Sequence, residues 1–395
     1  MLVNRRRFLT TALAANAVRP LTVSGAEAQL PATIADLPTP ALLVDLVAFE
    51  ANLKKMAEHC QQTNRGHRPH AKTHKCPEIA RRQVAAGALG VCVATVPEAE
   101  AMVAAGLSGV LLTSPIVEVG KIKRLVELAR KPGAVMLSVG HVREAELLVQ
   151  APQSAEVHLD VLIDVDVGDR RTGSLPGEPA VELARLLGQG KYLHVRGVQA
   201  YSGKSSHTVG FEERRKTSQA AWQQALETRD RLTRAGFEMK YVSGGSTGTY
   251  NIDSAIAGIT ELQVGSYVFM DVDYRRIGGQ GGAVYTDFQP SLTVLTTVVS
   301  AAHPERVTVD AGNKAFATDV ASKPEARHWT GLTYNRGGDE FGILTVEPDG
   351  KLPKIGDRLE FLTPHCDPTV NLYHRIYAVR GEKVEAAWPI VARRG

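Results

Sequence analysis

Short apolar runs alternate with helix-length periodic stretches through most of this 395-residue chain. The strand-like runs are residues 41–44, 68–71, 90–94, 109–113, 135–139, 157–165, 195–200, 241–243 and 261–264. The helix-like stretches between them include residues 42–60, 78–86, 97–105, 119–129, 142–148, 180–187 and 211–235. Short buried strands that alternate with helices predict right-handed βαβ units around a parallel sheet.

The number of repeats favours an α/β fold of the closed (β/α)8 TIM-barrel type, since about eight units fall within roughly 240 residues. No G-x-G-x-x-G follows the first strand, so a dinucleotide-binding sheet is disfavoured. From about residue 290 the helical period stops and short strands are separated by Gly, Pro and Asp turns. These strands are predicted at residues 291–300, 306–310, 342–346, 358–362, 375–379 and 384–388. We therefore expect a barrel over residues 41–285 and a C-terminal β-rich domain over residues 286–395.

The N-terminus is typical of an export signal. Paired arginines (Arg5, Arg6) precede Phe8-Leu9, a short apolar run and a small-residue cleavage pattern at Ala26-Glu27-Ala28. The apolar run is too short to cross a bilayer as a stable helix. We predict a twin-arginine signal peptide over residues 1–28, a linker over residues 29–40 and a periplasmic protein. The alternative is an amphipathic N-terminal helix on a cytoplasmic protein.

Composition narrows the class of protein. With 44% hydrophobic and 22% charged residues, the chain has an ordinary globular composition. The net charge is only +4, and no basic stripe interleaved with aromatic residues indicates a nucleic-acid partner. The four cysteines form no Cys-x-x-Cys pair and no disulfide framework.

Residues 67–77 form the most distinctive tract, with three histidines, one arginine and two lysines. Such a tract forms a solvated loop, a phosphate-binding patch or the site of an amine nucleophile. Lys72 directly follows the predicted strand 68–71, and active sites of (β/α)8 barrels lie where strands end. A pocket there can favour the neutral amine of Lys72, which then forms a Schiff base with a carbonyl. The alternative is an ordinary surface lysine.

Two glycine-containing turns follow the last two predicted barrel strands. Their backbone N–H groups can point at one anion, and barrels commonly hold phosphate at this position. The candidate phosphate-binding residues are Gly245, Ser246, Thr247, Gly265, Ser266 and Tyr267. Taken singly, each turn is as consistent with an ordinary loop.

Other strand ends carry an arginine, a tyrosine and a histidine. Arg171 follows the strand 157–165, where it can face a ring nitrogen, although a lone arginine is more often a surface ion-pair partner. Tyr201 and His207 follow the strand 195–200. His207 is a candidate general base, or else a solvated loop histidine.

His365, Cys366 and Asp367 form the last candidate site. If this segment is extended, residues i and i+2 share a face, so His365 and Asp367 can bind one divalent ion while Cys366 points elsewhere. Imidazole plus carboxylate favours Mn²⁺ or Mg²⁺, with Zn²⁺ possible. The alternative is a polar strand end without a metal.

Together these residues resemble the fold-type III pyridoxal-phosphate enzymes of the D-threonine aldolase and D-serine dehydratase group, which have an alanine racemase-like barrel. The resemblance covers almost the whole chain after the leader and is most specific at residues 68–80, 265–274 and 365–372. It implies that Lys72 holds pyridoxal 5'-phosphate, that Arg171 lies by the pyridine nitrogen and that the glycine turns hold the phosphate. It also implies a homodimer in which the β-rich domain of one subunit meets the barrel mouth of the other.

The metal motif separates activities within this group. The dehydratases have His-x-Cys and the aldolases His-x-Asp, and this chain has His365 and Asp367 in the aldolase spacing. His207 matches the histidine that serves the aldolases as base, whereas Ser202 stands where some aldolases have histidine and Phe341 stands where many do. We expect a metal-dependent aldolase (a carbon–carbon lyase) that cleaves D-3-hydroxy amino acids to glycine and an aldehyde.

Three rival functions remain open at this point. The nearest is a dehydratase that converts D-serine or D-3-hydroxyaspartate to a keto acid and ammonia. A non-catalytic pyridoxal-phosphate-binding protein would need Lys72 but neither His365 nor Asp367. An amino-acid racemase is disfavoured because the metal pair would have no role. In each case the expected partner is a small molecule, with no nucleic acid and no stable membrane insertion.

Overall fold

The computed structural model describes residues 30–151, 155–346 and 350–393. Its first sheet has eight strands in the order β2-β9-β8-β7-β6-β5-β4-β3, and every neighbouring pair is parallel. A parallel bridge between His70 and Cys92 joins the two edge strands and closes the barrel. The strands are β2 (Gly66–His67), β3 (Cys92–Val93), β4 (Val110–Leu112), β5 (Val135–Val139), β6 (Leu159–Asp164), β7 (Leu193–Ala200), β8 (Tyr241–Gly244) and β9 (Glu261–Leu262).

Helices connect these strands, and their ends follow local sequence rules. Asp45 caps the first helix by accepting hydrogen bonds from the N–H groups of Val47 and Ala48. Pro97 lies in the first turn of α3, where its missing N–H has no intrahelical partner. The helices are α1 (Leu46–Gln62), α2 (Pro77–Ala85), α3 (Val96–Ala104), α4 (Val119–Leu128), α5 (Val142–Gln150), α6 (Glu178–Leu187), α7 (Gly203–Ser206), α8 (Phe211–Arg234), α9 (Tyr250–Asp253) and α10 (Val272–Arg275).

Alternate residues of the barrel strands pack in two directions. Leu112, Leu137 and Ile163 belong to the large apolar core that also includes the helices. Their neighbours Leu111, Met136 and Leu162, together with Cys92, form a small separate cluster, as expected of side chains that fill a barrel interior. The period of two along each strand therefore produces both layers.

The second sheet has nine strands, seven of them in the order β13-β14-β11-β10-β1-β16-β17. Most of its strand pairs are antiparallel. One short helix, α11 (Cys366–Asn371), lies in the chain between β15 and β16. The strands of this sheet are β1 (Ala41–Asp45), β10 (Leu292–His303), β11 (Arg306–Val309), β12 (Glu325–Ala326), β13 (Leu332–Arg336), β14 (Gly342–Val346), β15 (Arg358–Leu362), β16 (Arg375–Arg380) and β17 (Lys383–Pro389).

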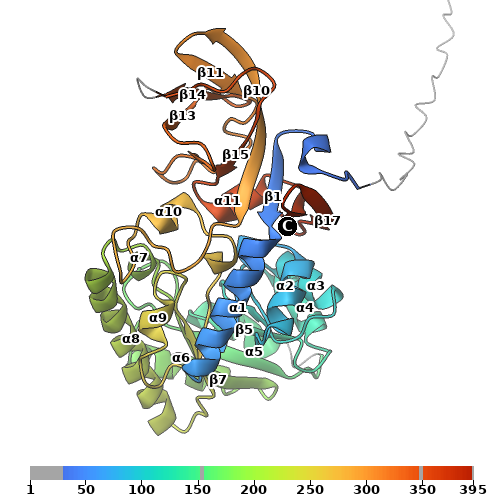
Figure 1. The fold of residues 1–395 in the computed structure, drawn as a ribbon. Coiled ribbons are helices and arrows are strands. Elements are labelled where there is room, and N and C mark those ends of the chain that lie inside the picture. Colours follow the sequence, from blue (N-terminus) through green and yellow to red (C-terminus); the bar gives the residue numbers. More distant parts are fainter. Residues whose placement is uncertain (1–29, 152–154, 347–349, 394–395) are drawn as a thin grey trace, which may run out of the picture. The chain divides into compact units, whose positions relative to one another are not determined.

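One predicted barrel strand belongs to this second sheet. β1 lies beside β10 (Figure 1), with Ala41 opposite Leu295, and its other neighbour is β16, with Leu43 opposite Tyr377. The expectation that residues 41–44 start the barrel is therefore wrong, and β2 is the first barrel strand. The sequence pattern could not distinguish the two sheets, because an apolar run of four residues suits either one.

The predicted fold class, a (β/α)8 barrel with a C-terminal β-rich part, is confirmed. The predicted division between barrel and β-rich domain at residues 285 and 286 stays a prediction. The predicted leader, residues 1–28, lies outside the described residues. Among the described residues, no helix is long and apolar enough to cross a membrane.

Candidate active site

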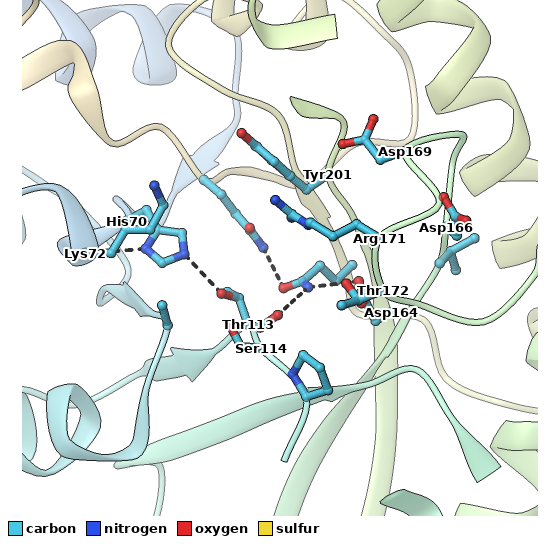
Figure 2. A pocket seen from close by; sticks show the side chains of 15 residues that line it. His70, Lys72, Thr113, Ser114, Asp164, Asp166, Asp169, Arg171, Thr172 and Tyr201 are labelled. Carbon is cyan, nitrogen blue, oxygen red and sulfur yellow. Dashed lines mark hydrogen bonds between the residues drawn. The ribbon is translucent and has the colours of Figure 1, made fainter. Parts of the chain in front are cut away.

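A cavity of about 450 Å³ lies at the carboxyl ends of the barrel strands (Figure 2). This is the end at which barrels of this type place their active sites. Of the residues predicted from the sequence, Lys72, Arg171 and Tyr201 line it. The remaining lining residues are His70, Ala94, Thr113, Ser114, Pro115, Asp164, Val165, Asp166, Asp169, Thr172, Gln199 and Gln263.

The cavity floor is a hydrogen-bonded polar network that the sequence analysis missed. Nε2 of Gln199 donates to Oδ1 of Asp164 at 2.9 Å, and Nε2 of Gln263 donates to Oε1 of Gln199 at 3.2 Å. Thr172 donates to the other carboxylate oxygen of Asp164 at 3.2 Å. Burial raises the pKa of Asp164, although these donors oppose the rise. Polar residues inside otherwise apolar predicted strands were the available signal.

Lys72 lies in η2 (Ala71–Thr73), one turn beyond β2, so its predicted place at a strand end is correct. Its side chain is 43% exposed, and its ammonium is paired with the carboxylate of Asp367. Burial alone would lower the pKa of Lys72, but the Asp367 carboxylate raises it above its usual value. The expectation of a lysine made neutral by its pocket is therefore wrong for this arrangement, because a carboxylate stabilises the charged form.

His70 supports the turn that carries Lys72. Its Nδ1 accepts a hydrogen bond from the Lys72 N–H at 3.4 Å, and its Nε2 lies 3.0 Å from Oγ1 of Thr113. The Thr113 hydroxyl itself donates to the carbonyl of Val93, so His70 is the donor to Thr113. Burial holds the pKa of His70 well below its usual value. His70 is therefore a neutral structural support.

The other cations of the tract have structural partners. Nζ of Lys75 lies 2.8 Å from Oε1 of Glu98 and donates to the carbonyl of Ala392 at 3.1 Å. Arg68 forms a two-point ion pair with Glu261, with both N–O distances at 3.0 Å. Lys72 is thus the lysine of this tract that reaches the cavity.

Arg171 and Tyr201 lie together on one side of the cavity. The Arg171 guanidinium lies over the Tyr201 ring, 5.2 Å from its centroid. Beside them, Oγ of Ser202 donates to Oδ1 of Asp169 at 3.0 Å and also caps α7. The Ser202 hydroxyl is therefore used to hold the two loops together.

The two predicted phosphate turns are adjacent. The Tyr267 N–H in η3 (Ser266–Val268) donates to Oγ1 of Thr247 at 3.0 Å, which joins the two turns. A Cβ at Gly265 would lie 2.7 Å from Oγ1 of Thr73, next to Lys72, so only glycine allows this approach. Gly245 has a φ of +75°. The side chain of Tyr267 is buried, and its hydroxyl accepts from Gln83 at 3.4 Å, so this hydroxyl faces away from the turns.

Backbone donors stay available at both turns. The N–H groups of Gly248 and Ser266 have no acceptor within the described parts of the chain. Ser246 differs, since its N–H donates to Oγ1 of Thr249 at 3.2 Å. The turns can therefore accept an anion in part through unpaired N–H groups.

His365 and Asp367 lie at the start of α11, so the prediction of an extended segment is wrong. His365 is the N-cap, and Asp367 and Pro368 fall in the first turn, where proline is tolerated. Burial alone would lower the pKa of His365, but nearby carboxylates, Asp367 foremost, raise it. His365 and Asp367 are therefore electrostatically coupled, although the backbone between them is helical and not extended. Among residues 30–151, 155–346 and 350–393, no cluster of three or more His, Cys, Asp or Glu side chains has the geometry of a metal site.

Asp271 holds the start of α11. Its Oδ2 accepts from the N–H of Cys366 and its Oδ1 from the N–H of Tyr274, both at 2.8 Å. One buried carboxylate thus caps both α10 and α11. Cys366 is fully buried beside it, and its Sγ donates to Oδ1 of Asp367 at 3.5 Å, so the expectation that this thiol points away from the metal pair is wrong.

His207 follows α7 and is 34% exposed. Its Nδ1 lies 3.0 Å from Oδ2 of Asp273, outside hydrogen-bond geometry, so the contact is electrostatic. Its ring packs on Tyr274, with centroids 4.7 Å apart. Burial alone would raise the pKa of Asp273, but His207 and Arg276 lower it below its usual value. His207 is not among the residues that line the cavity.

Comparisons with known proteins agree with this architecture. Residues 44–273 match the alanine racemase, N-terminal domain family, and residues 291–379 match the serine dehydratase domain. The chain is 38% identical to a D-threonine aldolase of Arthrobacter sp, over 91% of this chain and 94% of that protein. It is 36% identical to a 3-hydroxy-D-aspartate aldolase of Paracoccus denitrificans (strain Pd 1222), over 91% of this chain and 92% of that one.

A solved structure shows the same similarity in three dimensions. The crystal structure of D-threonine aldolase from Filomicrobium marinum superposes with a TM-score of 0.89 at 38% identity, covering 93% of this chain and 98% of that one. The dehydratases among the relatives found are between 22% and 30% identical. The aldolases are thus the more similar group.

Proposed function

This chain belongs to the alanine racemase N-terminal domain family, and from this premise we propose that it is a carbon–carbon lyase that cleaves D-3-hydroxy amino acids to glycine and an aldehyde. The observation that carries the proposal is the contact between Lys72 and Asp367. It brings the amine expected to bind the cofactor against a carboxylate of the metal motif. The His-x-Asp spacing and the greater similarity to aldolases support cleavage rather than dehydration.

The residues present fit pyridoxal 5'-phosphate. Lys72 is partly exposed at the cavity, and the N–H groups of Gly248 and Ser266 in the two glycine-containing turns are unpaired donors of the kind that a phosphate needs. Arg171 lines the same cavity as Lys72, so it would help to hold the pyridine ring of the cofactor. When bound, the cofactor supplies the electron sink for breaking the Cα–Cβ bond.

His365 and Asp367 would hold a divalent ion, with Mn²⁺ or Mg²⁺ favoured over Zn²⁺. Two protein donors leave open positions for the oxygens of a substrate. Such an ion supplies Lewis-acid polarisation of the β-hydroxyl group. His207 is the proposed base for the hydroxyl proton, and Oδ2 of Asp273 lies 3.0 Å from its Nδ1.

An assay of D-threonine and D-3-hydroxyaspartate tests this proposal when glycine and keto acid are both measured, with and without chelator. We expect glycine and aldehyde, loss of activity with chelator and loss of activity in Asp367→Ala. Keto acid as the product would establish a dehydratase instead. Chelator-resistant cleavage, retained by Asp367→Ala, would exclude the metal.

The proposal includes a homodimer and export by the twin-arginine route to the periplasm. The dimer is supported by the family resemblance, and export by Arg5, Arg6 and the apolar run after them. Light scattering of the purified protein tests the dimer. Cell fractionation of the wild type against Arg5→Lys/Arg6→Lys tests export, and retention of the variant in the cytoplasm is the expected result.

A further inference from the structure

A carboxylate outside every predicted motif contacts the histidine of the metal pair. Nδ1 of His365 donates to Oδ2 of Asp319 at 2.7 Å. This bond places the ring proton on Nδ1 and leaves the lone pair on Nε2, the nitrogen available to a cation. Histidine ligands commonly depend on such a partner for their tautomer and orientation. We infer that Asp319 is the positioning residue that fixes His365 for the divalent ion, an inference that rests on the proposed metal-dependent function.

The segment that carries Asp319 is held on both sides. The Ala317 N–H donates to Oγ1 of Thr369 at 3.0 Å, and the same hydroxyl donates to the carbonyl of His365 at 2.7 Å. Beyond Asp319, Oγ of Ser322 donates to Oδ1 of Asp273 at 3.2 Å. Asp319 is therefore fixed relative to the backbone of the histidine that it orients.

The same segment also reaches the proposed base. Asp273, which Ser322 contacts, is the carboxylate beside His207. The Nδ1 atom of each histidine assigned to the reaction thus lies near a carboxylate oxygen, through a hydrogen bond at His365 and through an electrostatic contact at His207. The segment 317–322 carries Asp319, contacts Asp273 through Ser322 and contacts Thr369 of α11 through the N–H of Ala317.

A role for Asp319 as a third metal ligand does not fit this geometry. Its carboxylate lies at Nδ1 of His365, whereas an ion shared with Asp367 requires the opposite ring nitrogen, Nε2. Asp319 is also 46% exposed, and pairs this accessible to solvent contribute little to folding stability. Its removal should therefore weaken the metal site and leave the fold intact.

Titration of the holoenzyme with Mn²⁺, with free Mn²⁺ measured by electron paramagnetic resonance, tests the inference. We expect Asp319→Ala to bind Mn²⁺ about 10- to 100-fold more weakly than wild type. Asp319→Asn keeps an acceptor oxygen without the charge and should lose less affinity. His365→Ala sets the loss for a true ligand, and Glu340→Gln, an exposed carboxylate paired with Lys314, is the matched control and should bind as wild type.

The outcomes separate the inference from the proposed function. Unchanged cofactor absorbance and thermal unfolding in Asp319→Asn show that the fold is intact, and its reduced Mn²⁺ affinity then supports the inference. If Asp319→Ala and Asp319→Asn both bind Mn²⁺ as wild type does, the inference falls and the proposed function stands. A loss equal to that of His365→Ala makes Asp319 a ligand and also overturns it. A wild type that binds no Mn²⁺ overturns the inference and the metal-dependent function together.

Discussion

The ammonium of Lys72 is paired with the carboxylate of Asp367, although 295 positions separate the two residues in the chain. The first belongs to the turn after β2 and the second to α11, so this pair joins the barrel to the β-rich part at the candidate active site. Lys72 therefore occupies the carboxylate that a divalent ion would need as a ligand.

Cofactor and metal should therefore bind with positive coupling. A lysine bonded covalently to the cofactor no longer offers its ammonium to Asp367, so Mn²⁺ meets less competition there. We expect the apoprotein to bind Mn²⁺ on the order of 10-fold more weakly than the holoenzyme. Lys72→Ala apoprotein should bind it more tightly than wild-type apoprotein. Equal affinities of these two apoproteins in a direct Mn²⁺ titration would contradict the coupling.

Lys72→Ala should lose the absorbance band of the lysine-bound cofactor. Lys75→Gln is the matched control, because Lys75 lies in the same tract but contacts Glu98 and the carbonyl of Ala392. The control should keep the band, with some loss of stability because Glu98 loses its charged partner in a buried setting. Ultraviolet–visible spectra of both variants provide the measurement. A band that survives in Lys72→Ala would refute the assignment of this lysine.

Gly265→Ala should weaken cofactor retention. Its new Cβ would lie 2.7 Å from Oγ1 of Thr73, so either the phosphate turn or the lysine turn must move. Gly281→Ala is the control, since a Cβ there meets no atom within 4 Å. Cofactor release on dialysis, followed by absorbance, should be faster for Gly265→Ala alone. Equal release rates in the two variants would show that the approach of these turns is unimportant for the cofactor.

His207→Asn should lower kcat by roughly 10²- to 10⁴-fold, the usual contribution of a general base. The cofactor band should be unchanged, since His207 does not line the cavity. His303→Asn, an exposed histidine at the end of β10, serves as the control. Near-normal turnover in His207→Asn would mean that another group accepts the hydroxyl proton.

Asp253 should make stability depend on pH. Its side chain is fully buried, and burial raises its pKa from 3.8 to about 6, although Ser218 and Thr249 donate to it. Between pH 4 and 6 the native state then holds more protons than the unfolded state, so the contribution of Asp253 to stability falls as pH rises through this window. Comparing the wild type with Asp253→Asn isolates the contribution of Asp253. The buried His67 and His74, whose pKa values are lowered to about 4, contribute equally to both proteins.

The measurement is denaturant unfolding of the wild type and Asp253→Asn at pH 4.5 and pH 7.5. The free energy of unfolding of the wild type, relative to the variant, should be greater at the lower pH by about 2 kcal/mol, since pH 4.5 lies about 1.5 units below the native pKa. A difference that is independent of pH would mean that Asp253 titrates alike in both states.

The sequence was sufficient to predict the barrel and several of the residues that line the cavity. Regular alternation of strand and helix patterns predicted the fold class, and positions after strands predicted Lys72, Arg171 and Tyr201 as cavity residues. It was insufficient where contacts depend on tertiary structure. Asp319 and His365 are 46 positions apart, and nothing in the pattern of a loop carboxylate indicates which histidine it meets. The pKa of Lys72 was mispredicted for the same reason, since its direction depends on Asp367.

The place of β1 has a consequence for how the polypeptide is made. Asp45 pairs with Val379, so β1 has left the ribosome long before its parallel neighbour β16 has been synthesised. With translation at roughly 5–20 residues per second, that strand waits on the order of half a minute without its partner. During this interval an apolar edge is exposed to other nascent chains. The second sheet, and with it the approach of Asp367 to Lys72, is therefore completed only near the end of translation.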